Sequence, residues 1–196
     1  MSRFTMCQRK ILVFSLFVLT GLSSCYVNSD RKSASYYEKN QPEINTIRRL
    51  YDSLYIHQPF SIGFTDKTFK YYVMEVITDT LRSIFNNEQS EKQLFETIVR
   101  FNYDTSMLRQ LSTKMKEIEC LWIDKASFYL DEKKDTVTFF SFKSVLIDKP
   151  FVENKYYILL FLDKKPDHPY LTNRVKKGEI VRINDLVYFM IGNKFR

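Results

Sequence analysis

Glycine, cysteine and histidine are all scarce in this chain. Its 196 residues include four glycines, three cysteines and two histidines. Phosphate-binding loops, dinucleotide-binding turns and the Gly-x-Ser-x-Gly elbow of hydrolases need closely spaced glycines, and none of these motifs occurs. No Cys-x-x-Cys pair and no His-Glu-x-x-His sequence is present either. The sequence therefore predicts a protein without a metal site or a cofactor.

The two histidines stand in sequence contexts that do not mark an active site. His57 follows the first expected helix, where imidazole interacts favourably with the helix dipole. His168 lies near Asp163 and Asp167, which together could ligate a divalent metal, but lysines and prolines give this stretch the composition of a solvated loop. A nucleophile triad of Cys120 with either histidine has no local marker, although such residues meet only in space. We therefore expect no enzyme, with a hydrolase as the less favoured alternative.

Cysteine and carboxylate side chains are expected to be structural. Cys120 follows the strand-like alternation around it and is predicted to be a small buried residue. The acidic residues in 131–135 stand beside two lysines and predict an exposed, mutually neutralised turn. Glu75 and Asp124 interrupt apolar strands and would be ligand or acid–base candidates if they pointed inward. We expect them to point outward instead, because antiparallel sheets commonly have one solvent-exposed face.

The first 24 residues have the anatomy of a secretory signal. Three basic residues precede a twelve-residue apolar run from Ile11 to Leu22, and no acidic residue occurs before Asp30. The sequence Leu22-Ser23-Ser24-Cys25 resembles the lipobox of bacterial lipoprotein precursors. The resemblance implies diacylglycerol transfer to the Cys25 sulfur, cleavage before Cys25, and acylation of the new amino terminus.

This resemblance implies that the protein is located in the bacterial cell envelope. The apolar run would rise about 18 Å as a helix, whereas the bilayer core needs about 30 Å, so an uncleaved anchor helix is disfavoured. Tyr26 follows Cys25, where an Asp would resemble an inner-membrane retention signal. We therefore expect the lipid to anchor the protein in the outer membrane, facing the periplasm. Exposure on the cell surface is the alternative.

The mature chain has the size and charge of one ordinary domain. Cleavage before Cys25 would remove 24 of the 196 residues and leave 172. We expect a signal peptide at 1–24, the lipidated cysteine and a polar tether at 25–41, and a single domain at 42–196. Three of the 30 basic residues and none of the 23 acidic ones lie in the signal, so the net charge falls from +7 to +4. These charges are interspersed and give no support to a nucleic-acid partner.

The apolar residues alternate between helical and strand-like periods. Helices are predicted from Pro42 to near His57, after a capping box at Ser90-x-x-Gln93, and after a cap at Asp104. Strands are predicted at 61–64, 69–77, 81–85, 120–130, 137–146, 156–162, 180–183 and 186–191, the last two joined at Asn184-Asp185. This order predicts an α+β fold with a mostly antiparallel sheet and two or three helices. A curved sheet wrapped around a helix, as in cystatins or NTF2-like proteins, is one architecture that fits.

Aromatic residues are abundant, with 17 phenylalanines and 13 tyrosines beside only two alanines. The adjacent pairs Tyr71-Tyr72 and Tyr156-Tyr157 place one ring on each face of a strand, so both rings cannot easily join one core. Tyrosine suits interfaces because it has an apolar body and a polar tip. These four tyrosines are the predicted partner- or ligand-binding residues, unless helices bury both faces of the sheet.

Together these observations predict a lipid-anchored envelope protein without catalytic activity. Its expected role is a binding or accessory module for a membrane-associated protein partner, since a tether raises the effective concentration for such a partner. The alternative is a small-ligand domain with a pocket lined by Phe and Tyr in a curved sheet. An enclosed cavity would favour this alternative, and a solid core would exclude it.

Overall fold

The computed structural model describes residues 34–65, 68–79, 82–86, 91–130, 133–143, 156–166 and 169–192. The chain divides into two compact units, Met1–Lys39 and Asn40–Arg196. The described part of the first unit, residues 34–39, is helical. The second unit begins with helical residues 40–57, which we call the first helix.

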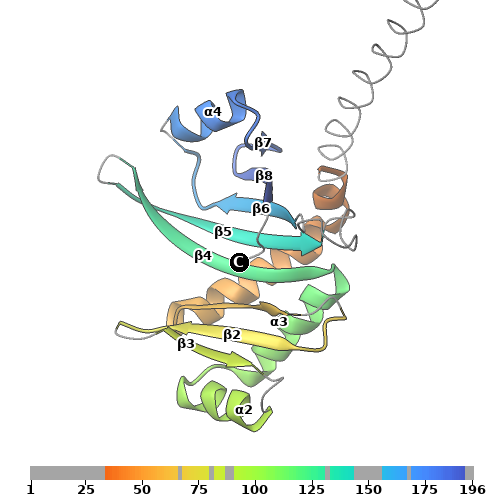
Figure 1. Ribbon diagram of the computed structural model, residues 1–196, viewed down its shortest axis with the longest axis vertical. Helices are drawn as coiled ribbons and strands as arrows, with labels where there is room; N and C mark the ends of the chain where they lie inside the picture. The colour runs from red at the N-terminus through yellow and green to blue at the C-terminus, as the bar shows by residue number, and fades with distance from the viewer. Residues whose placement is uncertain are drawn as a thin grey trace, which may run out of the picture. The chain divides into compact units, whose positions relative to one another are not determined.

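The second unit continues with eight strands and three further described helices (Figure 1). In chain order, these elements are β1 (Phe60–Phe64), β2 (Tyr72–Ile77), β3 (Arg82–Asn86), α2 (Glu91–Arg100), α3 (Thr105–Glu117), β4 (Cys120–Leu130), β5 (Lys133–Lys143), β6 (Tyr156–Leu162), α4 (Pro169–Lys176), β7 (Val181–Arg182) and β8 (Val187–Gly192). Helices and strands are thus grouped rather than strictly alternating, which confirms the predicted α+β class.

All eight strands join one sheet in the order β3-β2-β1-β4-β5-β6-β8-β7. Every described pair of neighbouring strands is antiparallel, as predicted. Strands β1 to β3 form one meander and β4 to β6 another, and the segment between them carries α2 and α3. Figure 1 shows β4 and β5 as long, strongly bent strands across the middle of the sheet. The sheet is therefore antiparallel and curved.

The first helix packs on one face of this sheet. Its residues Ile44, Ile47, Tyr51 and Leu54 are buried at helical spacing. The Tyr51 hydroxyl donates a hydrogen bond to the Phe60 carbonyl, at 2.5 Å, and the two rings lie 5.0 Å apart. Burial, with the Asp124 charge as the next cause, raises the Tyr51 pKa well above its ordinary value, so this hydroxyl stays a donor.

Ion pairs also tie the first helix to the sheet. The Lys125 ammonium on β4 lies 2.9 Å from the Asp52 carboxylate of the helix and 3.9 Å from the Asp163 carboxylate after β6. Arg48 of the helix also approaches Asp163, at 3.9 Å, and its guanidinium lies over the Phe161 ring. Asp163, a candidate metal ligand in the sequence, thus forms ion pairs between the first helix and the sheet.

A second, smaller core covers the opposite face. Because side chains alternate along a strand, residues one position from those facing the first helix point the other way. Helix α4 covers this face, and the buried cluster beneath it consists of Val137, Ile158, Leu160, Leu162, Leu171, Ile180 and Tyr188. Strand β6 lies between β5 and β8 and is buried on both faces from Ile158 onward, as its continuous apolar run predicts.

Two predicted local signals form as expected. The Asp104 carboxylate accepts a hydrogen bond from the Met107 backbone N–H at 2.9 Å and caps α3. The Asn184 side-chain oxygen accepts from the backbone N–H groups of Leu186 and Val187, which fixes the turn between β7 and β8. The capping box at Ser90 and the end of the predicted strand at 144–146 lie outside the described residues.

Two element boundaries and one additional helix are among the differences from the prediction. Residues 34–41 are helical, so Pro42 does not begin the helix. Strand β5 begins at Lys133, inside the predicted turn, because the antiparallel ladder with β4 continues to the pair Leu130↔Lys133. Helix α4 was not predicted at all, since its only buried residue is Leu171 and a single turn of apolar spacing gives no periodicity.

Candidate ligand pocket beneath helix α4

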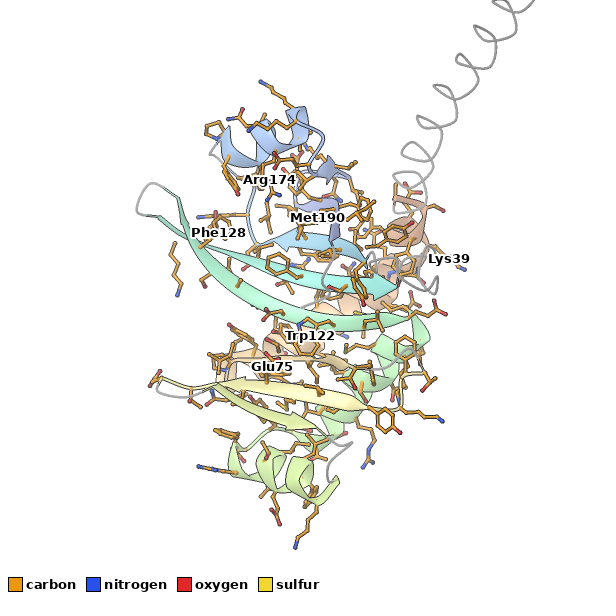
Figure 2. All side chains as sticks on the ribbon, in the orientation of Figure 1. Lys39, Glu75, Trp122, Phe128, Arg174 and Met190 are labelled. Atoms are coloured by element: carbon orange, nitrogen blue, oxygen red, sulfur yellow. The ribbon has the colours of Figure 1, made fainter. Side chains whose placement is uncertain are left out.

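A cavity of about 460 Å³ lies between α4 and the sheet face opposite the first helix. Eight of its eleven lining residues are apolar: Ala126, Phe128, Val137, Phe139, Leu160, Leu162, Leu171 and Met190. The other three are Tyr170, Arg174 and Tyr188. Figure 2 labels Phe128, Arg174 and Met190, which come from β4, α4 and β8. The volume falls within the range of small-molecule sites, about 300–1,000 Å³.

The floor of the pocket follows from strand register. Ala126 of β4 pairs with Val137 of β5, and the next ladder positions bring together Phe139, Leu160 and Tyr188 from β5, β6 and β8. Alternation points all of these side chains to the same face. Ala126 is one of only two alanines in the chain. Its small side chain leaves space among the larger floor residues.

The roof of the pocket is α4. Leu171 is buried and Val175, one turn later, is half-buried against the second core. Tyr170, 46% exposed, and Arg174 are likewise one turn apart and line the pocket from the helix. Pro169 stands at the first helical position, where its missing N–H costs no helical hydrogen bond.

A glycine turn after α4 positions the charge at the pocket. Gly178 has φ 70°, a conformation that residues with a Cβ rarely adopt. Its N–H donates to the Val175 carbonyl, and the Glu179 N–H donates to the Arg174 carbonyl, the pattern of a Schellman turn. The turn brings Glu179 back to the helix, where its Oε2 lies 2.8 Å from Arg174 Nε.

Among the described residues that line the pocket, Arg174 is the one with a charged side chain. Its Nε donates to Glu179 and its guanidinium lies over the Tyr170 ring, 5.8 Å from the centroid. Within the described residues, the two terminal amino groups of this guanidinium make no hydrogen bond to protein. These amino groups are geometrically suited to a bidentate contact with a carboxylate or phosphate.

The four tyrosines singled out from the sequence do not line this pocket. Tyr71, 39% exposed, stands just before β2, and Tyr72 begins β2 with its ring 5.8 Å from Phe64. Tyr156 packs beside the second core, and Tyr157 lies 5.5 Å from the Phe189 ring on the opposite face. Strands β1, β4 and β5 separate the two pairs. The tyrosines that the structure does bring together are Tyr170 and Tyr188, which the sequence analysis did not single out.

The remaining sequence candidates do not assemble into a catalytic or metal site among the described residues. His57 is exposed at the last residue of the first helix. Cys120 is fully buried, burial raises the pKa of its thiol, and the S–H donates to the Trp122 carbonyl. No three His, Cys, Asp or Glu side chains of the described segments gather as a metal site. Cys25 and His168 lie outside those segments.

Glu75 and Asp124 were expected to point outward to a solvated face of the sheet. This expectation is wrong for Glu75. The Glu75 side chain is 6% exposed, because its strand β2 is buried on both faces. It pairs in register with Ser61, whose hydroxyl donates to the Asp124 carboxylate at 2.6 Å. Asp124 is half-buried and accepts a second hydrogen bond from the Lys125 N–H. Neither carboxylate lines the pocket.

No described helix is long and apolar enough to cross a membrane. Comparisons with protein-family models, with curated proteins and with solved structures find no match for this chain. Its function therefore has to be inferred from the pocket and from the residues around it.

Proposed function

We propose that this protein is a lipid-anchored envelope protein whose domain binds a small amphipathic molecule beneath α4. The observation that carries the binding role is the cavity of about 460 Å³ with eight apolar residues among its eleven lining residues. A largely apolar, preformed pocket with a few polar groups is the usual form of a small-molecule site. The pocket supports the ligand-binding alternative over an aromatic docking patch, because the two tyrosine pairs lie three strands apart.

The proposed role is binding rather than catalysis. Among the described residues that line the pocket, the polar groups are two phenols and a guanidinium, from Tyr170, Tyr188 and Arg174. These groups can orient a ligand, but they include no nucleophile paired with a general base. A membrane-associated protein partner, expected from the sequence, stays a prediction.

The size of the pocket can be measured with neutral probes. We expect straight-chain alcohols from butanol to dodecanol to bind with rising affinity, because each buried methylene contributes about 0.8 kcal/mol, which is about fourfold in affinity. The increase should stop at the chain length that fills the cavity. Isothermal titration below the solubility limit of each alcohol measures this series. Absent binding, or affinity that keeps rising with length as in surface adsorption, would contradict the proposal.

The proposed location in the cell rests on the lipobox sequence and on Cys25. We propose attachment to the outer membrane facing the periplasm, with the cell surface as the alternative. When the full chain is expressed in a bacterium, the mature protein should enter the detergent phase on phase separation, because two or more acyl chains anchor a protein stably. The Cys25→Ala variant should stay in the aqueous phase or in the uncleaved precursor. Equal partitioning of both forms, with no lipid mass on the N-terminal peptide, would contradict lipidation.

A further inference from the structure

We infer that the pocket beneath α4 takes a single-chain amphiphile with an anionic head group, the chain lying on the apolar floor and the head group on Arg174. This inference rests on the proposed ligand-binding function. It adds the chemical class of the ligand and the residue that selects it.

The placement of Arg174 supports an anionic head group. The side chain lines the pocket, yet it is only 29% exposed, so its charge is partly withdrawn from water. Glu179 engages Nε alone, at 2.8 Å, and no described protein group accepts from the terminal amino groups. An oxyanion at the pocket can therefore bind these two amino groups end-on without displacing Glu179.

Two contacts hold the guanidinium in this position before a ligand arrives. The Tyr170 ring lies beneath it, and the Schellman turn at Gly178 fixes the backbone that carries Glu179. A side chain that is already oriented loses less rotamer freedom on binding. Arg174 is thus preorganised for a ligand and does not need to be recruited from solvent.

The charge around the pocket also supports an anionic head group. The segment 169–192, which forms α4, β7 and β8, carries four basic and two acidic residues, a net charge of +2. Lys176 and Lys177 follow Arg174 on the exposed side of α4 and the turn after it. Arg182 and Lys165 share the Asp185 carboxylate. An anionic head group is therefore attracted to this end of the domain and a cationic one is repelled.

The apolar part of the ligand is set by the floor. Alternating residues of β4, β5, β6 and β8 provide aliphatic and aromatic side chains, and Tyr188 is the one described floor residue with a polar tip. A buried sugar or peptide backbone would leave several hydrogen-bonding groups without partners here, which is costly. An unbranched hydrocarbon chain has no such groups and fits a lining of this kind.

The test compares four probes that share one chain and differ in the head group: decanoate, decyl phosphate, decanol and decyltrimethylammonium. Each is titrated calorimetrically at neutral pH into the mature protein. We expect at least one of the two anions to bind about 10–100-fold more tightly than decanol, as expected for hydrogen bonds to a charged group. The cation should bind more weakly than decanol. Whichever of decanoate and decyl phosphate binds more tightly shows whether the preferred head group is a carboxylate or a phosphate.

Arg174→Gln provides the variant, because it removes the charge and the two terminal amino groups but leaves a polar side chain at this position. It should lower the affinity for the preferred anion to that for decanol and leave decanol unchanged. The control is Arg182→Gln, which removes a nearby charge that is paired with Asp185 and does not line the pocket. This control should lower the affinity for the anion far less than Arg174→Gln does, because the Arg182 charge is already paired with Asp185.

The outcomes separate the two proposals. If decanol binds the wild type as tightly as both anions do, or if Arg174→Gln leaves the preference for the anion intact, the inference about the head group is overturned while the binding function stands. If none of the four probes binds the wild type, the proposed function itself fails. A preference for the anion that disappears in Arg174→Gln and persists in Arg182→Gln supports both.

Discussion

Replacing Ala126 with phenylalanine should reduce the affinity of the pocket for a decyl-chain ligand by at least about 100-fold while leaving the domain folded. Ala126 lies on the pocket floor, opposite Val137 and within the apolar lining. A phenyl ring at this position would occupy the volume that the chain of the ligand needs. Losing even part of a buried decyl chain removes several methylene contributions of about 0.8 kcal/mol each, which accounts for the expected loss.

The same substitution should not lower the melting temperature. Large side chains destabilise a core when they are forced into filled space, but here the ring enters an existing cavity and buries additional apolar surface. The matched control is Ser127→Phe, because Ser127 is the next residue of β4, exposed and directed to the other face of the sheet. Ligand binding that survives in Ala126→Phe, or that is lost equally in Ser127→Phe, would show that the ligand does not lie in this cavity.

Much of the fold could be predicted because its signals are local. The strand-like alternation of 120–130, the apolar run of 156–162, the Asp104 cap and the Asn184 turn each depend on neighbours within a few residues. The grouping of strands and helices then indicates an antiparallel α+β fold without any knowledge of the register. These features agree with one another, and this agreement is typical of sequences that specify a single fold.

The pocket could not be predicted, because its parts meet only through tertiary structure. Its floor combines positions from four strands, and a shift of the register by one residue would turn every one of these side chains to the other face. Its roof is an eight-residue helix with a single fully buried residue, Leu171. The contact between Arg174 and Glu179 depends on the left-handed glycine at 178. Only the rarity of alanine, with Ala126 among large residues, was visible in the sequence as a sign of unfilled space.

The four tyrosines named from the sequence do not gather in one place in the structure, and the cover on the sheet explains the position of the C-terminal pair. Adjacent tyrosines do point to opposite faces, but the structure covers both faces of the C-terminal half of the sheet, one with the first helix and the other with α4. Tyr156 and Tyr157 therefore each lie beside a core. Whether a sheet is covered on one face or on both is decided by a helix outside the strand sequence.

Gly63→Ala should be among the most destabilising single substitutions in this domain, with an expected loss above about 3 kcal/mol, compared with about 1–3 kcal/mol for ordinary overpacking. A Cβ on Gly63 would lie 2.2 Å from the Leu121 carbonyl oxygen and 2.4 Å from Cε3 of Trp122. The first of these atoms belongs to the backbone of β4, so a rotamer change cannot relieve the contact. The neighbouring strands must move apart instead.

This separation would occur at a short ladder between the two halves of the sheet. Among the described strands, β1 is the one that pairs the β3-β2-β1 half with the remaining five strands, and its register with β4 consists of Ile62↔Ile123 and Gly63↔Trp122. Chemical denaturation of the variant should show a lower midpoint, because a loss above about 3 kcal/mol is a large share of a typical stability of about 5–15 kcal/mol. The control is Ser61→Ala, on the same face of β1, which removes one hydrogen bond to Asp124 and should cost about 1 kcal/mol. Equal losses in the two variants would mean that β1 and β4 separate without penalty, and that the two halves of the sheet fold independently.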